Sequence, residues 1–457
     1  MPSATVDFSA CDSVLAPDAL LLRYDEIAMK GRNRSRFERL LVRRARAQVD
    51  ELAALTFERE RGRIWALRAG GGALGAQVLH AVRDNAHRVF GLSSISPGVR
   101  VEPSLEALDG CVDRVFPVLY QRCAAQLAED APVRYAMRMR RHGGGFGMKS
   151  QAVEIHVADR LLAKYPRLKV DLADPDLRLE VEVRPGRAFL SWERVPGPGG
   201  LPVGCSGTAL ALVSGGIDSP VACRQMMKRG CRLHYVTFHS APYTPPETVE
   251  KVARLVRVLN RYQDPGRLFA VNLLPFQKRV RDHCQEKFRT LMYRRMMMRI
   301  ACWIADRMHA GSLVTGDCLG QVASQTLRNL NTVERAADRL VLRPLISFDK
   351  KESIAIARGT GTLDISNENV PDSCTVFAPA SPATGAHPHQ LEHEEQRLLA
   401  AWAAERRGDD TDKEDDFLML MQACFRESAE IDVESGRESP FMEAIPPPSP
   451  AKPTTLR

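Results

Sequence analysis

The chain has 457 residues, which is too long for a single compact core. Of these residues, 44% are hydrophobic and 26% are charged, a composition that is ordinary for a folded protein. It contains no apolar run of about 18 residues and no charged-then-apolar leader, so we expect no membrane span, no secretion signal and a cytoplasmic location. Its 11 cysteines are scattered and include no Cys-x-x-Cys pair, which favours reduced thiols over disulfides or a metal cluster.

Charge is unevenly distributed along the chain. The net charge is +8, but residues 408–457 contain 12 Asp or Glu against 5 Lys or Arg, so the rest of the chain is strongly basic. A basic body favours a polyanionic partner, with nucleic acid first in line. Residues 391–457 are expected to form an acidic, partly disordered tail, with the disorder over 428–457, where a proline run occurs.

The N-terminal half predicts two units built from strands and helices. A glycine-rich break at 70–75 separates them, and the Pro/Gly stretch at 195–204 marks a domain boundary. The predicted strands are 20–24, 64–67, 134–139, 177–183 and 187–192, and the predicted helices are 37–49, 76–90 and 104–128.

Two basic patches occur in this half. Seven arginines fall within residues 32–46, and their spacing does not fit one helix face, so part of the group is expected to be solvated surface: Arg32, Arg34, Arg36, Arg39, Arg43, Arg44 and Arg46. Residues 134–149 add further basic side chains around a glycine-rich loop. Solubility alone explains such charges, but two patches ahead of a phosphate-binding turn favour contact with an RNA backbone.

The most informative motif is the turn from Ser214 to Ser219, with the sequence Ser-Gly-Gly-Ile-Asp-Ser. A buried strand at 209–213 precedes it, and Pro220 suits the first turn of a helix. A strand-to-helix turn presents free N–H groups and a helix dipole to an anion, and glycine lets a phosphate approach the backbone. The motif lacks the lysine of a Walker loop, so Asp218 is expected to face a metal bound to the phosphates.

Alternating elements follow this turn and indicate a parallel sheet. The predicted strands are 209–213, 233–238, 267–273 and 312–315, with helices at 220–229, 247–261 and 287–309. Ligands of such sheets bind at the carboxyl ends of the strands, where the turn, residues 237–240 and residues 315–317 are expected to meet.

Further candidate residues lie downstream. Arg294 is placed to reach a nucleotide, residues 316–326 form a polar loop after a strand, and one of Lys350 and Lys351 is a candidate catalytic lysine. Cys374 lies in a proline-bounded loop; a free cysteine is usually an inert small hydrophobe, but a thiolate near a basic nucleotide site is a candidate sulfur carrier. His387, His389 and His393 are expected to be solvated rather than zinc ligands.

Taken together, these motifs resemble the tRNA 4-thiouridine synthetase (tRNA sulfurtransferase) family over about residues 20–385. Besides the turn at 214–219 and the linker at 197–204, the resemblance includes Leu22-Arg-Tyr-Asp-Glu-Ile27 with Lys30-Gly-Arg-Asn33, Phe238-His-Ser240, Leu319-Gly-Gln-Val-Ala-Ser-Gln-Thr326 and Leu342-Arg-Pro-Leu345. It implies a multidomain α/β fold: a ferredoxin-like domain (1–83), a THUMP RNA-binding domain (84–196) and a pyrophosphate-loop, adenine nucleotide α-hydrolase-like catalytic domain with a parallel sheet (197–390), before the tail.

The resemblance also implies the chemistry. ATP with Mg²⁺ adenylates O4 of uridine 8 in tRNA, and sulfur from a persulfide, loaded by a cysteine desulfurase, displaces AMP to give 4-thiouridine. The turn residues Ser214, Gly215, Gly216, Asp218 and Ser219 are implied to handle pyrophosphate, and Asp218 the metal. Nucleotide contacts are implied at Leu212, Val213, Thr237, Phe238, Arg294, Gly316 and Gln325, with Lys350 needed for activity and Cys374 as the sulfur acceptor.

Departures from the family pattern leave some points open. Thr237 stands where the family commonly has His, and Asp25 where it commonly has Gly. No rhodanese-like domain is expected after the catalytic domain, so sulfur donation to thiamine thiazole synthesis is not favoured. The thiol that regenerates Cys374 is left open among Cys205, Cys318 and Cys424, and so is the oligomeric state, a homodimer included.

Two other functions compete with this one. Another pyrophosphate-loop ligase, such as a lysidine synthetase, would explain the turn but not the basic N-terminal domains or Cys374. An RNA-binding protein with a vestigial nucleotide site would explain the basic body, but not the joint presence of Asp218, Gln325 and Lys350.

Overall fold

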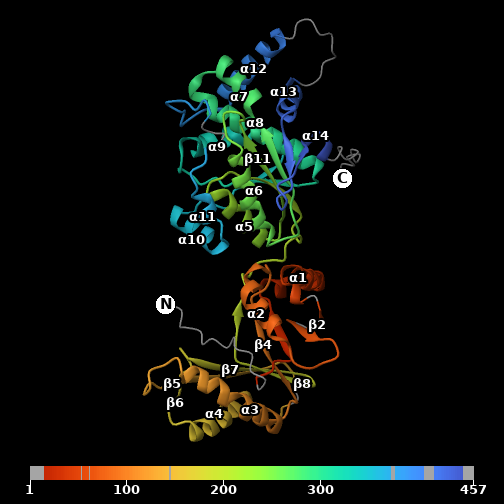
Figure 1. The fold of residues 1–457 in the computed structure, drawn as a ribbon, viewed down its shortest axis with the longest axis vertical. Helices are drawn as coiled ribbons and strands as arrows, with labels where there is room; N and C mark the ends of the chain where they lie inside the picture. The colour runs from red at the N-terminus through yellow and green to blue at the C-terminus, as the bar shows by residue number, and fades with distance from the viewer. Residues whose placement is uncertain are drawn as a thin grey trace. The chain divides into compact units, whose positions relative to one another are not determined.

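The computed structural model describes residues 15–52, 54–60, 62–143, 146–371, 376–405 and 416–445. The chain divides into two compact units, residues 1–202 and 203–457 (Figure 1). Within the described ranges, no helix is both long and apolar enough to cross a membrane.

The first unit is built on one sheet. Its strands follow the order β2-β3-β1-β4-β8-β7-β5-β6, with β9 pairing at the side of β4. Helices α3 and α4 pack against β5, and α3 also packs against β7 (Figure 1). The Phe116 and Tyr135 rings meet edge-to-face, with 5.6 Å between their centroids. The strands are β1 (Ala19–Arg23), β2 (Leu55–Glu60), β3 (Arg63–Arg68), β4 (Ser94–Val101), β5 (Val133–Arg141), β6 (Leu168–Val170), β7 (Leu177–Arg184), β8 (Arg187–Ser191) and β9 (Val195–Pro196), and the helices are α1 (Arg34–Gln48), α2 (Ala76–Asn85), α3 (Leu105–Ala124) and α4 (Ser150–Lys164).

Strand β4 joins the two halves of this unit. It pairs with β1 on one side and with β8 on the other, and the boundary expected after residue 83 falls inside α2. β4 is not predicted from the sequence, because Pro97 and Gly98 lie inside it and both residues usually interrupt strands. Gly98 is there because a Cβ would lie 2.3 Å from the carbonyl oxygen of Leu190 on β8.

The two basic patches are more ordered than expected. In α1, Arg36, Arg39, Arg43 and Arg46 share one exposed stripe, whereas Arg34 pairs with Glu38 at 3.4 Å and Arg44 is buried. The seven arginines therefore do not share one face, as expected, although four of them form one exposed stripe. In the second patch, Arg134 is neutralised by ion pairs with Asp174 and Asp176.

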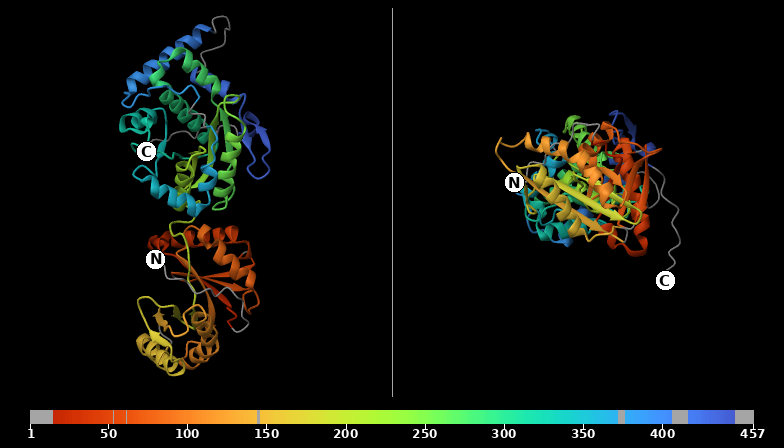
Figure 2. Two further views of the ribbon diagram at one scale, coloured as in Figure 1. Left: turned by 60° about the vertical axis from the view of Figure 1, so that its left-hand side comes forward. Right: turned by 90° about the horizontal axis from the view of Figure 1, so that it is seen from below.

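The second unit is a parallel sheet with helices on both faces (Figure 2). Its strand order is β14-β13-β10-β11-β12-β15-β16, and the first five of these strands are parallel. The strands and helices predicted for 209–315 are confirmed; the elements missed there and downstream are mostly short. The elements are β10 (Thr208–Leu212), α5 (Asp218–Lys228), β11 (Arg232–His239), α6 (Glu247–Asn260), β12 (Leu268–Asn272), α7 (Leu274–His283), α8 (Arg289–Arg307), β13 (Ser312–Val314), α9 (Leu327–Glu334), β14 (Leu340–Leu342), α10 (Lys350–Thr360) and α11 (Leu363–Ser366).

The segment expected to be a partly disordered tail is folded wherever it is described. Helices α12 (Pro388–Glu405), α13 (Asp416–Phe425) and α14 (Phe441–Ala444) contribute apolar residues to the core. Strands β15 (Ala429–Ile431) and β16 (Glu438–Pro440) extend the sheet beyond β12. The acidic residues find basic partners: Glu430 pairs with Arg267 at 2.5 Å, and Glu395 with Arg295 at 2.7 Å. The expectation of disorder over 428–457 is wrong for 428–445, and residues 391–405 and 416–427 belong to the folded unit rather than to a tail. The proline run at 446–450 lies outside the described residues.

Candidate nucleotide-binding site

The turn from Ser214 to Ser219, called here the phosphate turn, links the carboxyl end of β10 to the start of α5. The Ser219 hydroxyl closes it by accepting a hydrogen bond from the Ser214 N–H (3.0 Å) and donating to the Ser214 carbonyl (3.2 Å). Because β11 and β13 flank β10 in parallel, their carboxyl ends meet at the same edge of the sheet. The amino end of α5 therefore faces the place where a parallel sheet binds ligands.

Two glycines let neighbouring segments pack against this turn. At Gly316, directly beyond β13, a Cβ would lie 2.7 Å from the Ser219 nitrogen, so only glycine lets the strand end approach α5 this closely. At Gly215, a Cβ would lie 3.2 Å from Cδ of the buried Lys251. The Lys251 ammonium donates to the carbonyls of Ser366 and Glu368, which ties the turn region to the chain leading towards residue 371.

A pocket of about 400 Å³ opens at these strand ends. Its mixed lining offers an apolar wall, hydroxyls, one carboxylate from the turn and the guanidinium of Arg294. Eight of the residues predicted for the site line it: Leu212, Ser214, Gly216, Asp218, Ser219, Arg294, Gly316 and Gln325. The other lining residues are Thr290, Met297, Met298, Thr315, Asp317, Val322 and Ser324.

Other predicted residues lie outside this lining. Val213, Thr237 and Phe238 are buried, and the Val213 N–H bonds the Val236 carbonyl in β11. Gly215 lines a second, smaller pocket of about 270 Å³ behind the turn. The side chains of Val213, Thr237 and Phe238 do not line the larger pocket; they are buried and support it from within the sheet.

Asp317 organises the pocket, although no individual role is predicted for it above. Its carboxylate accepts hydrogen bonds from Arg294 (2.5 Å), Gln325 (3.3 Å) and Thr315 (2.8 Å) and pairs with Arg343 at 3.4 Å. Burial alone would raise the pKa of Asp317, but Arg294, Thr315 and Arg343 outweigh it and lower that pKa. The signal in the sequence was an acidic residue just after a predicted strand.

Asp218 is the other carboxylate of the site. Its Oδ2 accepts hydrogen bonds from the Lys350 ammonium (2.7 Å) and the Gln321 amide (3.0 Å). Its Oδ1 is buried and has no hydrogen-bond partner. An unsatisfied carboxylate oxygen beside a phosphate turn fits a hard divalent cation such as Mg²⁺. The described residues contain no group of three or more His, Cys, Asp or Glu side chains that could bind a metal without a further ligand such as a phosphate.

Cys374 lies outside the described residues, but the chain on both sides of it is held. The Thr248 hydroxyl donates to the Pro371 carbonyl at 3.0 Å, and the Phe377 ring meets Tyr243 edge-to-face at 5.2 Å. Among the candidate partner thiols, burial raises the pKa of Cys424 to about 12 and also raises the pKa of Cys318. Cys205 is partly exposed.

Comparison with known families agrees with this architecture. Residues 204–399 match the family described as thiamine biosynthesis protein (ThiI), residues 19–96 match the ThiI ferredoxin-like domain, and residues 114–193 match the THUMP domain. The chain is 42% identical over 385 residues to a probable tRNA sulfurtransferase of Nocardia farcinica, an alignment that covers 83% of this chain and 89% of the relative. A probable tRNA sulfurtransferase of Brevibacillus brevis is 36% identical over 371 residues, covering 81% and 89%.

Solved structures give the same result. A 4-thiouridine synthetase in complex with RNA and bound ATP is similar with a TM-score of 0.75 and 32% identity, covering 91% of this chain and 99% of that one. Fold, turn and pocket thus define an RNA-modifying enzyme with ferredoxin-like, THUMP and pyrophosphate-loop domains. The chain belongs to the tRNA sulfurtransferase family.

Proposed function

We propose that this enzyme uses ATP to adenylate O4 of uridine 8 in tRNA and then replaces that oxygen with sulfur to give 4-thiouridine. The observation that carries the proposal is the single pocket in which the phosphate turn meets Arg294, Asp317 and Gln325. A cytoplasmic location follows from the tRNA substrate. The similar 4-thiouridine synthetase with bound RNA and ATP supports the same substrates here.

ATP would lie with its phosphates on the turn and its adenosine along the apolar wall. The N–H groups at the start of α5 and the helix dipole favour a polyphosphate. Leu212, Met297 and Met298 offer apolar surface for a base. Arg294 is held in place by Asp317 and by the Ser324 hydroxyl at 3.0 Å, so its guanidinium is preorganised for an anion.

Asp218 would hold a Mg²⁺ ion through its unsatisfied Oδ1. When bound, that ion neutralises phosphate charge and makes pyrophosphate a better leaving group. Lys350 balances the charge of Asp218 in the free site, and it lies at the first position of α10. Its ammonium is thereby placed to stabilise negative charge that develops between the α and β phosphates.

Cys374 would accept sulfur from a cysteine desulfurase as a persulfide. Pro371, the last described residue before Cys374, is tied to α6 beside the phosphate turn. The terminal sulfur would attack C4 of the adenylated uracil, and AMP would leave. A second thiol would then attack Sγ of Cys374, forming a disulfide with it and releasing 4-thiouridine as the S–S bond to the uridine sulfur breaks; an external thiol would reduce that disulfide. The exposure of Cys205 favours it over the buried Cys424 as this second thiol.

The test is reconstitution with the full chain. Purified protein, unmodified tRNA, ATP, Mg²⁺, cysteine and a cysteine desulfurase should give AMP, pyrophosphate and 4-thiouridine, read by near-ultraviolet absorbance and nucleoside analysis. Formation of AMP linked to a base other than uracil would point to a different pyrophosphate-loop enzyme. Absence of any ATP cleavage with bound tRNA would overturn the proposal.

A further inference from the structure

An exposed aromatic side chain lies beside the nucleotide-binding site, and the proposed chemistry gives it no role. Tyr243 is 53% exposed and lies in the loop that follows β11. The Val213 N–H bonds the Val236 carbonyl, so the phosphate turn and the Tyr243 loop leave neighbouring parallel strands at the same edge of the sheet. An aromatic ring that faces solvent at the ligand-binding edge offers a surface to a planar partner.

The loop that carries Tyr243 is held in place. The Ser240 N–H donates to the Thr244 hydroxyl at 2.9 Å, and the Ser240 hydroxyl donates to Oε1 of Gln277 on α7 at 2.6 Å. Both hydrogen bonds are buried, and the Tyr243 N–H closes the turn on the Ser240 carbonyl at 2.7 Å. Because this loop is already ordered, a ligand that binds Tyr243 loses no affinity to ordering it.

Phe377 supports the Tyr243 ring from the side. The two rings meet edge-to-face, with 5.2 Å between their centroids. The backbone of Phe377 is left-handed, with φ at 56°, a conformation that is costly for a bulky residue and persists where the surrounding structure imposes it. Further along, the Ala383 N–H donates to the Lys287 carbonyl at 3.0 Å and fixes the chain that carries Phe377.

Arg281 completes this group. Its guanidinium lies over the Phe377 ring at 4.9 Å and pairs with the Asp282 carboxylate at 2.7 Å. A guanidinium is planar and donates several hydrogen bonds, so it suits a partner that combines a flat ring with carbonyl or phosphate oxygens. Tyr243, Phe377 and Arg281 are called here the aromatic platform.

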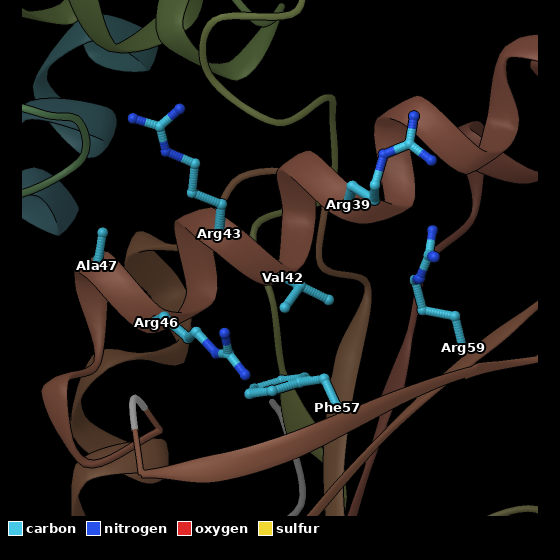
Figure 3. Close-up of a pocket in the computed structure, with 7 residues that line it drawn as sticks. All are labelled: Arg39, Val42, Arg43, Arg46, Ala47, Phe57 and Arg59. Atoms are coloured by element: carbon cyan, nitrogen blue, oxygen red, sulfur yellow. The ribbon is translucent and has the colours of Figure 1, made fainter.

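Exposure identifies the ring of the platform that meets a ligand. Phe377 is only partly exposed and lies beneath Arg281. Phe57 in the first unit has the same arrangement, with Arg46 over its ring at 4.8 Å (Figure 3). In both pairs the protein's own guanidinium covers the phenylalanine, whereas Tyr243 faces solvent. Tyr243 is therefore the contact surface.

The start of α8 joins the platform to the nucleotide-binding pocket. The Arg289 guanidinium donates to the Arg281 carbonyl at 3.2 Å. The next residue, Thr290, lines the pocket together with Arg294. The platform and the pocket are therefore neighbours at one end of this helix.

The proposed reaction supplies a partner of the right shape. O4 of a uracil reaches the α phosphate of ATP only after the base has left its stack in the folded RNA. An unstacked base loses its contacts with neighbouring bases, and an aromatic side chain replaces them. One exposed ring suits one base, whereas a stable protein interface needs roughly 800 Å² from each partner.

We infer that the aromatic platform is the site for the target uracil, which stacks on Tyr243 after it leaves the RNA stack and before it is adenylated. This inference rests on the proposed adenylation of tRNA. Stacking tolerates any base, so the platform holds the base while other contacts select uracil.

A photo-crosslink tests the contact directly. The full chain is mixed with tRNA that carries 5-iodouridine at the target position, a nucleoside that crosslinks on irradiation to an aromatic ring in contact with it. Mass spectrometry should place the crosslink on Tyr243 in the wild type, and Tyr243→Leu should abolish it. A crosslink confined to other residues, or none in the wild type, would overturn the inference.

Kinetics of the variants give a second test. The rate of tRNA adenylation should fall about tenfold to a hundredfold in Tyr243→Leu, which cannot stack on a base, and should stay within about twofold of the wild type in Tyr243→Phe, which keeps the ring. Leu340→Ala is the control, because Leu340 is 63% exposed but lies at the amino end of the parallel strands. It should leave the rate unchanged.

The outcomes separate this inference from the proposed function. If the wild type does not adenylate tRNA, the proposed function fails and this inference fails with it. If the wild type adenylates tRNA and Tyr243→Leu does so equally fast, only this inference fails. Persulfide loading by a cysteine desulfurase without tRNA should be equal in the wild type and Tyr243→Leu. A selective loss of loading would make Tyr243 part of a docking surface for the desulfurase and overturn the inference.

Discussion

The ammonium of Lys350 donates a hydrogen bond to Oδ2 of Asp218 at 2.7 Å, although the two residues are 132 positions apart in sequence. This contact joins the start of α10 to the phosphate turn at the start of α5. It places the Lys350 ammonium, which suits a phosphate, beside the Asp218 carboxylate, which suits a metal ion.

Replacing the carboxylate that we propose holds Mg²⁺ should slow the first chemical step. We expect Asp218→Asn to lower the rate of tRNA adenylation by about 10²–10³-fold, because the amide keeps the shape but removes the charge that holds Mg²⁺. Filter binding should show unchanged tRNA affinity, as Asp218 belongs to the second unit alone. Normal ATP–pyrophosphate exchange by the purified variant would contradict the assignment.

Removing the charge of Asp317 should act on nucleotide binding instead. Asp317→Asn leaves Arg294 and Arg343 without their carboxylate, and we expect the KM for ATP to rise about tenfold to a hundredfold. Asp306→Asn is a suitable control, because that exposed carboxylate pairs with Arg339 and does not line the pocket. A KM equal to that of the control would show that Asp317 does not position Arg294.

Adding one methyl group at Gly316 should destabilise the second unit. The new Cβ would lie 2.7 Å from the Ser219 nitrogen, so α5 must shift, at a cost of about 1–3 kcal/mol. Gly311→Ala has open space around it and should change the free energy of unfolding little. Urea denaturation of the two variants measures the difference, and equal midpoints would show that the contact relaxes freely.

The ion pair between α8 and α12 should make stability depend on acid pH. Burial opposes ionisation of Glu395, but Arg295 and Arg299 outweigh it and lower its pKa below the usual value of about 4.3. The unfolded chain therefore takes up a proton at a higher pH than the folded chain, so this stabilisation is complete above about pH 5 and is lost as pH falls through the lowered pKa.

The variant Glu395→Gln tests this dependence. It leaves Arg295, which is 2% exposed, without its carboxylate, and we expect a loss of about 3–5 kcal/mol at pH 7. The difference from the wild type in urea denaturation should shrink as the pH is lowered towards 3. A difference that stays constant over that range would mean that Glu395 is not ionised in the folded protein.

The sulfur step should depend on Cys374 without affecting adenylation. In Cys374→Ser the pocket residues are untouched, so ATP cleavage with tRNA should continue while 4-thiouridine no longer forms. Labelled cysteine and a desulfurase should transfer label to the wild type and not to this variant. Full thiolation by the variant would assign sulfur delivery to another thiol or to free sulfide.

Local patterns predicted the parallel sheet and the phosphate turn because strand, glycine and helix signals follow one another directly there. They did not predict the residues that hold the side chains of the site in place. Asp317 acts through Arg294, Gln325 and Arg343, which lie up to 26 positions away, and single-residue patterns carry no record of such partners. The C-terminal segment shows the same limit: the sequence indicates an acidic tail that ends in a proline run, whereas Glu395 and Glu430 have arginine partners more than 90 positions earlier.

The late position of β15 and β16 in the sequence determines when the sheet of the second unit can be completed during synthesis on the ribosome. Strand β12 emerges about 160 residues before β15, its antiparallel neighbour, so at 5–20 residues per second its edge stays unpaired for roughly ten to thirty seconds. During that interval an apolar strand edge is open to pairing with other chains. We therefore expect nascent chains released before residue 429 to aggregate, and sedimentation of ribosome-released fragments ending at 415 and 445 would measure how much residues 416–445 protect the sheet.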